Sequence, residues 1–230
     1  MVPGDPHEWA RRRALRLAAA LQQAYAEALL AGDPRAAEAV IREAIDGGLD
    51  EAMIDDHVIG PSLVLVGDLW ADGELSVVEE HLATSISRRV ITLQREAFRV
   101  ARQRSSLRVV LAAVQGEQHV VGLEMAANLI LHAGYDVRLL GADVPVAQLP
   151  AAVQRHRPVV VGLTTASAIT TANALAAIEL LRETGAGCGI VVGGRGADDR
   201  WTHRGDLVVC QHVSDAVAHV DALVQRARHN

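Results

Sequence analysis

Hydrophobic and polar positions follow two different rhythms along this chain of 230 residues. From about Glu8 to Arg104 the apolar residues return every three or four positions, which is the spacing of amphipathic helices. After the polar stretch 103–106, short β-branched runs alternate with further helical stretches. We therefore expect two domains, a helical bundle over residues 1–104 and an α/β domain over residues 105–230.

Caps and turn residues divide the first domain into helices. Asp33 and Pro34 supply an N-cap and a first-turn proline, and Ser76 with Glu79 has the spacing of a capping box. The glycine and proline at positions 60–61 predict an interruption within one helix. The expected helices run over about residues 9–31, 34–47, 50–72 and 76–102.

The second domain reads as a repeated alternation of strand and helix. The expected strands cover residues 108–114, 136–140, 159–164, 189–192 and 207–209, and the expected helices 120–133, 146–156, 168–183 and 214–227. Such alternation implies a parallel sheet with helices on both faces. Five units of this kind fit a flavodoxin-like, Rossmann-like fold, whose ligand crevice lies beyond the carboxyl ends of the strands.

Composition and charge exclude several classes of protein. Half of the residues are hydrophobic, yet there are only one Phe and two Tyr, so the core must consist of Ala, Val and Leu. A net charge of −6 argues against general nucleic-acid affinity. The arginine clusters at 11–13 and 88–89 fall within helical patterns, where a solvated helix face explains them.

The chain carries no recognisable membrane or export signal. No apolar run is long enough to cross a membrane, and residues 1–6 lack the basic and apolar regions of a signal peptide. Cys188 and Cys210 have no metal-ligand spacing, and we expect them to be reduced and buried. These observations predict a cytoplasmic protein.

The turn after the first expected strand holds the most informative residues, Glu117-Gln118-His119-Val120-Val121-Gly122. Glu117 precedes the histidine by two positions, so its carboxylate could hold the Nδ1–H group and leave Nε2 open to a metal. Gly122 removes a side chain where the next helix begins, which lets a bulky group approach the backbone. A lone histidine in a loop is more often a surface or capping residue, so this spacing by itself is weak.

Small and hydroxyl-bearing residues mark two other strand ends at the same edge. Thr164 and Thr165 end the third expected strand, and Gly193 and Gly194 end the fourth. Together they outline a narrow slot of hydroxyls and bare backbone, suited to a long polar tail. The alternative is a response-regulator-like domain in which His119 is incidental. Such domains need a phospho-acceptor Asp after the third strand, a place that this chain fills with Thr164, Thr165 and Ala166.

With these residues, the segment 107–227 resembles the cobalamin-binding domain of methionine synthase, the cobalamin mutases and related corrinoid proteins. The motif positions are Glu117, His119, Gly122, Thr164 and Gly193-Gly194. Glu117 stands where the family usually has Asp, and Thr164 where it usually has Ser. The resemblance implies that His119 ligates cobalt from the lower face, displacing the dimethylbenzimidazole tail. It also implies that the cofactor meets the residues Gln118, Val120, Val121, Gly122, Thr164, Thr165, Gly193 and Gly194.

A second set of residues lies in the helical domain: Trp70 and, after nine intervening positions, Glu80 and His81. A bundle tryptophan is usually core and an adjacent acid and histidine are usually a surface pair, but as a set they could cover a nucleoside by stacking and hydrogen bonding. The set and the phrase 66–77 resemble the cap of CarH-type photoreceptors, adenosylcobalamin-dependent repressors related to the MerR family. The resemblance implies that the three side chains shield the 5′-deoxyadenosyl group on the upper face of cobalt.

The chain departs from those photoreceptors in two ways. They carry a winged-helix DNA-binding domain before the bundle, where this sequence has only a few residues, so we expect no direct DNA binding. They can also carry a histidine directly after the tryptophan, which captures cobalt once light removes the adenosyl group. Ala71 occupies that position here, which leaves His81 or water for the upper site.

Two main functions compete. The first is a cobalamin sensor rather than an enzyme, in which light, redox state or cofactor supply changes how adenosylcobalamin holds the two domains and thereby alters a protein partner or self-association. The second is a corrinoid carrier of a methyltransferase system, which would use methylcobalamin. A cobalamin subunit of a radical mutase is a third alternative, but that chemistry needs a substrate barrel that this sequence does not contain. The stimulus, the partner and the oligomeric state are left open.

Overall fold

The computed structural model describes residues 6–99, 105–198, 201 and 207–229. The chain divides into two compact units, Met1–Arg99 and Val100–Asn230. The sequence-based boundary after Arg104 lies outside the described residues.

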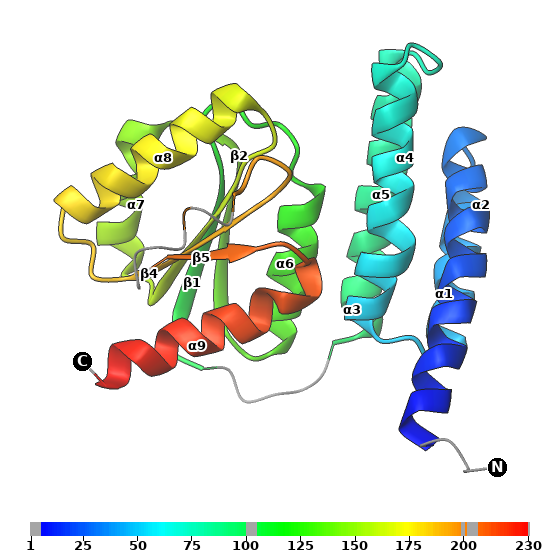
Figure 1. Ribbon diagram of the computed structural model, residues 1–230, viewed down its shortest axis with the longest axis horizontal. Coiled ribbons are helices and arrows are strands. Elements are labelled where there is room, and N and C mark those ends of the chain that lie inside the picture. The colour runs from blue at the N-terminus through cyan, green and yellow to red at the C-terminus, as the bar shows by residue number, and fades with distance from the viewer. Residues whose placement is uncertain (1–5, 100–104, 199–200, 202–206, 230) are drawn as a thin grey trace. The chain divides into compact units, whose positions relative to one another are not determined.

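The first unit consists of helices, as the apolar spacing predicts (Figure 1). They are α1 (Pro6–Leu30), α2 (Pro34–Asp46), α3 (Glu51–Ile54), a π-helical turn η1 (Asp55–Ile59), α4 (Gly60–Ala71) and α5 (Val77–Ala97). Both predicted caps are present. The Asp33 carboxylate accepts hydrogen bonds from the first amides of α2. Ser76 and Glu79 form a reciprocal capping box, with the Ser76 amide 2.7 Å from the Glu79 carboxylate.

The expected interruption at positions 60–61 is a change of helix type rather than a break. The Gly60 amide donates to the Asp55 carbonyl, one residue further back than in an α-helix, and the helix continues through Pro61. A side chain at position 60 would crowd this turn, because its Cβ would lie 2.9 Å from the Asp55 carbonyl oxygen. At the other end, α5 stops at Ala97, before the expected end at Arg102, which lies outside the described residues.

Polar side chains are buried within the first unit beside the apolar core. The hydroxyl of the fully buried Tyr25 donates to Ser87 over 3.2 Å. The Gln94 amide donates to the Asp55 carboxyl over 2.9 Å, and both residues are only 1% exposed. Burial, reinforced by the nearby Glu51 and opposed by the Gln94 hydrogen bond, raises the pKa of Asp55 to about 8.

The second unit is a five-stranded parallel sheet in the order β2-β1-β3-β4-β5, which confirms the predicted fold class. The strands are β1 (Arg108–Val114), β2 (Asp136–Val144), β3 (Val160–Thr164), β4 (Gly189–Gly193) and β5 (Leu207–Cys210). The helices are α6 (Val121–His132), α7 (Leu149–His156), α8 (Ala168–Glu183) and α9 (Ala216–His229). Helices α6 and α9 cover one face of the sheet, and α7 and α8 cover the other (Figure 1).

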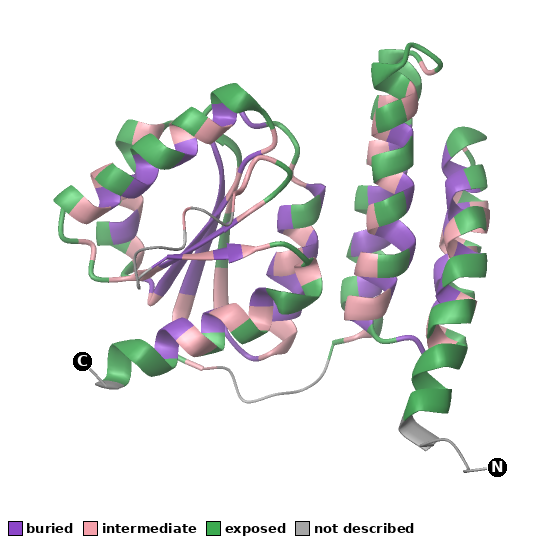
Figure 2. Ribbon diagram, viewed as in Figure 1, coloured by how far each residue is buried: buried purple, intermediate pink, exposed green. Residues whose placement is uncertain are grey.

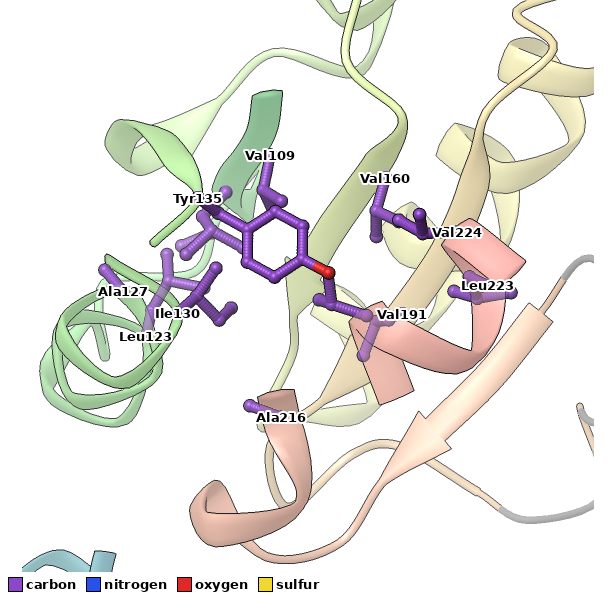
Figure 3. Packing of buried hydrophobic residues seen from close by; sticks show 13 residues of the cluster. Val109, Leu123, Ala127, Ile130, Tyr135, Val160, Val191, Ala216, Leu223 and Val224 are labelled. Atoms are coloured by element: carbon purple, nitrogen blue, oxygen red, sulfur yellow. The ribbon is translucent and has the colours of Figure 1, made fainter. Parts of the chain in front are cut away.

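Alternate residues of β1 pack into the hydrophobic clusters on the two faces of the sheet. Val109 and Leu111 pack with α6 and α9, and the Tyr135 ring joins that cluster in Figure 3. Ala112 and Val114 point to the other face and pack with α7 and α8. The central strands are buried on both sides (Figure 2), as expected for a parallel sheet between helices.

Two expectations about the second unit need correction. β2 continues to Val144, four residues beyond its expected end at Leu140, because a register shift opposite Ala112 accommodates Gly141 at φ +90°. Cys188 and Cys210 form no disulfide, as expected, but they are half-buried rather than buried. Within the described residues, no helix combines the length and apolarity needed to cross a membrane.

Candidate cofactor site

The order of the strands fixes where a ligand site can form in the α/β unit. The chain moves from β1 outward to β2 and then returns past β1 to β3, so the loops after β1 and β3 leave the sheet in different directions. In sheets of this kind, ligands bind in the crevice at that switch point, beyond the carboxyl ends of the strands. The loop 115–120 follows β1 and the loop 165–167 follows β3, so both groups of predicted residues lie at this edge.

The Glu117 carboxylate links the two loops across the switch point. Its Oε2 accepts hydrogen bonds from the Ala166 amide at 2.6 Å and from the Thr170 hydroxyl at 3.0 Å. Its Oε1 accepts the His119 amide at 2.9 Å and lies 2.6 Å from His119 Nδ1. Glu117 is only 1% exposed, and both of its carboxylate oxygens accept hydrogen bonds, as is usual for a buried polar group.

The protonation state of Glu117 follows from these contacts. Burial raises the pKa of its carboxyl, but the hydrogen bonds from the His119 amide, the His119 ring and Thr170 outweigh burial, and the pKa lies below its ordinary value. Glu117 is therefore ionised at neutral pH, and its neighbour His119 Nδ1 must carry the proton. In the neutral ring with this tautomer, the lone pair lies on the other nitrogen, Nε2, and the side chain is 76% exposed.

Thr170 is a member of this site that the sequence motif does not reveal. It lies in the first turn of α8, where Ser167 and Thr170 form a reciprocal capping pair. That pair is visible in the sequence as a helix start, but the reach of the Thr170 hydroxyl to Glu117 is not. The Glu117 side chain thus reaches the first turn of α8 and the loop before it.

The ends of β3 and β4 meet closely. Thr164 pairs with Gly193 in the sheet, and the Thr165 amide donates to the Gly193 carbonyl over 3.1 Å. Gly194 has φ +93°, and a Cβ there would collide with the Thr165 carbonyl and approach Thr164 Oγ1 to 2.8 Å. A glycine is therefore required at position 194 both by its backbone angle and by its neighbours.

Thr165 faces inward rather than into the crevice. It is fully buried, and its hydroxyl lies 2.8 Å from that of Thr170, with which it shares a hydrogen bond. Its side chain thus supports the residue that holds Glu117, while the half-buried Thr164 stays nearer the surface.

The start of α6 is open where a bulky group would need space. Gln118 and His119 are exposed, Val120 is half-buried and Val121 is buried as the first residue of α6. A Cβ built at Gly122 would meet nothing within 4 Å, so the first turn of this helix offers bare backbone to the outside.

The predicted residues of the helical unit gather at one hairpin. Trp70 lies near the end of α4, and its carbonyl accepts the Gly73 amide in the turn that leads to α5. Trp70 is 48% exposed, so it is not a core residue of this unit. Glu80 and His81 lie in the first turns of α5, 3.7 Å apart between Oε2 and Nε2, and Thr84 donates to the other Glu80 oxygen. Exposed apolar side chains accompany them: Val77, Val78 and Leu82.

The parallel fold, the switch-point histidine and its buried carboxylate define a cofactor-binding α/β protein with a helical partner unit. A family model described as a B12 binding domain matches residues 107–221, and a second model of the same description matches residues 21–93. The chain belongs to the B12 binding domain family, and it is a cobalamin-binding protein.

Curated relatives of two kinds are similar in sequence to this chain. The HTH-type transcriptional repressor CarH of Myxococcus xanthus is 39% identical over 110 residues, which are 48% of this chain and 36% of that protein, so this chain spans about a third of that repressor. The trimethylamine corrinoid protein of Methanosarcina barkeri is 28% identical over 202 residues, which are 85% of this chain and 93% of that protein.

A solved structure supports the same fold. The monomethylamine corrinoid protein of Methanosarcina barkeri matches with a TM-score of 0.71 over 86% of this chain and 96% of that one, at 14% identity. At that identity the likeness bears on the fold alone. It agrees with helices followed by a Rossmann-like domain in one chain.

Proposed function

We propose that His119 is the axial ligand of cobalt in a bound cobalamin. When bound, cobalamin would supply a cobalt ion that its macrocycle already holds. A single side chain, His119, would then be enough to ligate the metal. No group of three or more His, Cys, Asp or Glu side chains in the described part of the chain is arranged to hold a bare metal ion, whereas His119 presents one exposed imidazole nitrogen.

The chain's own residues fit this role through their hydrogen bonds. The ionised Glu117 holds the proton on His119 Nδ1 and thereby keeps Nε2 as the coordinating atom. Ala166 and Thr170 hold Glu117 in turn, so the imidazole is oriented from α8 across the switch point. Removing any of these partners would loosen the orientation of the ring.

The remaining motif residues fit the lower half of the cofactor. Bare backbone at Gly122 leaves room for the cofactor beside the ligand. Gly193 and Gly194 lie with Thr164 at the strand ends along which the nucleotide tail would run. Gln118, Val120 and Val121 lie next to the ligand and complete this side. Thr165 contributes from beneath, through Thr170.

The biological role that the helical unit favours is a cobalamin-dependent sensor that binds adenosylcobalamin. The observation that carries this choice is Trp70, a half-exposed indole at the same hairpin as Glu80 and His81. An indole stacks on a purine, and a carboxylate and an imidazole can hydrogen-bond ribose hydroxyls, whereas a methyl group needs neither. We therefore assign Trp70, Glu80 and His81 to the adenosyl group. With Ala71 beside Trp70, an upper ligand after loss of that group would come from His81 or water.

A corrinoid carrier for methyl transfer is the second candidate. It is favoured by the extent of the match to the trimethylamine corrinoid protein, which covers 93% of that relative. A carrier would bind methylcobalamin and a methyltransferase partner, and a sensor would bind a signalling partner or a second copy of itself. The two roles share the lower ligand and differ on the upper face.

A titration in the dark separates the candidates. The purified chain is titrated with adenosylcobalamin and with methylcobalamin, and visible spectra and oligomer size are recorded before and after illumination. A preference for the adenosyl form, with a light-dependent change in spectrum or size, supports a light sensor. A preference for the methyl form reverses the order of the two candidates.

A further inference from the structure

Asp143, next to the end of β2, has an unusual backbone conformation. Its φ is +52°, and among the described residues the only other non-glycine residue with a positive φ is Arg157, at φ +48°. A side chain with a Cβ is disfavoured in this left-handed region, and such residues persist where the surrounding structure holds them. Arg157 is the C-cap of α7, a common place for this angle, but Asp143 lies next to the cofactor loop.

Both the side chain and the backbone amide of Asp143 form hydrogen bonds with that loop. Its carboxylate accepts the Gly116 amide over 2.7 Å, and its own amide donates to the Glu117 carbonyl over 3.0 Å. The two hydrogen bonds flank the peptide unit that joins Gly116 to Glu117: one binds the Gly116 amide before it and the other the Glu117 carbonyl after it. Asp143 is itself exposed, so burial in the core does not explain its conformation.

Glu117 is consequently held from two sides of the switch point. Its main chain is bound from β2 through Asp143, and its side chain is bound from β3 and α8 through Ala166 and Thr170. The loop lies beyond the last paired residue of β1, Val114, where the sheet ladder no longer holds it. Asp143, the penultimate residue of β2, therefore extends the contacts of that strand onto the loop through these two hydrogen bonds.

We propose that Asp143 is a positioning residue for the cobalt ligand: its carboxylate and its left-handed backbone fix the 116–117 peptide, so that Glu117 can direct the His119 imidazole. This inference rests on the proposed role of His119. The residues that position the imidazole would then lie on both sides of β1: Ala166 and Thr170 after β3, and Asp143 in β2.

Two substitutions separate the carboxylate from the backbone angle. Asp143→Gly relieves the positive φ and removes the acceptor, and Asp143→Asn keeps an acceptor oxygen in a residue that tolerates the left-handed region. Asp143→Ala serves as a second variant without the acceptor. Arg157→Gly is the matched control, because it relieves the same backbone angle at a helix end outside the cofactor loop. Circular dichroism confirms that each variant folds.

The first measurement uses the chain without cobalamin. NMR of isotope-labelled protein reports hydrogen exchange at the Gly116 amide and the tautomer of His119. We expect Asp143→Gly and Asp143→Ala to lose protection at Gly116 and to populate both tautomers, while Asp143→Asn and Arg157→Gly behave as the parent chain does. Unchanged Gly116 and His119 signals in Asp143→Gly, or an equal disturbance in Arg157→Gly, would overturn the proposal.

The second measurement titrates the same proteins with aquacobalamin. We expect Asp143→Gly to bind about tenfold more weakly, as is typical when a group that orients a metal ligand is removed, and Asp143→Asn to restore binding. An Asp143→Gly affinity equal to that of the parent would contradict the positioning role. If the parent spectrum itself does not depend on His119, the proposed function fails, and the NMR signals of the cobalamin-free chain still decide whether Asp143 fixes the loop.

Discussion

Glu117 Oε1 lies 2.6 Å from His119 Nδ1, and the same oxygen accepts the His119 amide at 2.9 Å. One carboxylate oxygen therefore fixes both the backbone and the ring of the residue that it orients. Because Glu117 is buried and the imidazole is exposed, the ring has a firm base and a free outer nitrogen. A metal ligand requires this combination of a fixed ring and an accessible nitrogen.

Replacing the imidazole tests the ligand directly. His119→Ala should remove the histidine-ligated visible spectrum of bound cobalamin and weaken binding by more than about tenfold. Folding should be unaffected, because the side chain is 76% exposed. The measurement is a spectroscopic titration with aquacobalamin. His57→Ala, at an exposed histidine of the helical unit, is the control, and a ligated spectrum that persists in His119→Ala would refute the assignment.

The upper-face assignment is tested through Trp70. Trp70→Ala should lower the affinity for adenosylcobalamin and leave the affinity for methylcobalamin nearly unchanged, because only the adenosyl group offers a ring for stacking. Parallel dark titrations with the two cofactors measure the ratio. Trp9→Ala is the matched control, since Trp9 is 63% exposed on α1. An adenosyl preference that survives Trp70→Ala would count against the cap.

The glycine at the end of β4 predicts a steric penalty that can be separated from backbone strain. Gly194 and Gly185 both have positive φ, so an alanine at either position is strained by about 1–2 kcal/mol. Only at Gly194 would the new Cβ collide with the Thr165 carbonyl, whereas at Gly185 it meets nothing within 4 Å. Gly194→Ala should therefore lower the free energy of unfolding by about 1–3 kcal/mol more than Gly185→Ala. Urea unfolding of both variants checks this, and equal losses would show that the close approach is not rigid.

The buried Asp55 predicts how the stability of the helical unit depends on pH. Burial raises the pKa of its carboxyl to about 8, with Glu51 adding to the shift and the Gln94 hydrogen bond opposing it. Between the ordinary pKa near 4 and this raised value, the folded unit binds a proton that the unfolded chain releases. The stabilising contribution is thus complete at low pH and is lost as pH rises through about 8.

The corresponding experiment compares urea unfolding across pH 5 to 9. The free energy of unfolding should fall with rising pH, by at most about 1.4 kcal/mol per pH unit from this group, and level off above its pKa. Asp55→Asn, which is neutral at every pH, should flatten the dependence, while Asp56→Asn at the less buried neighbour should not. A parent chain with the same slope as Asp55→Asn would mean that Asp55 is ionised in the folded unit.

Local patterns explain most of what the sequence could predict. The capping box of Ser76 and Glu79 and the contact of Glu117 with His119 both join residues two or three positions apart, so spacing was enough. The alternation of strands and helices likewise predicted the parallel sheet, because short runs of β-branched residues can be recognised directly in the sequence.

The contacts that spacing missed depend on distant parts of the chain. Thr170 reaches Glu117 across 53 positions, and Asp143 reaches Gly116 across 27. Both need the strand order and register, and β2 includes Asp143 only because a register shift at Gly141 lets the strand continue past its expected end. The π-helical turn before Gly60 is also not predicted, because the glycine and proline at 60–61 indicate an interruption without showing its geometry.

The hydrogen bonds around Glu117 have a consequence for the thermodynamics of binding. A loop that becomes ordered only around its ligand loses conformational freedom at that moment, which weakens the affinity. Here the carboxylate and the main chain of Glu117 are already bound to α8 and to β2. The conformational entropy of this loop is lost during folding, so the chain should meet its ligand as a rigid receptor, with little heat-capacity change beyond that of surface burial.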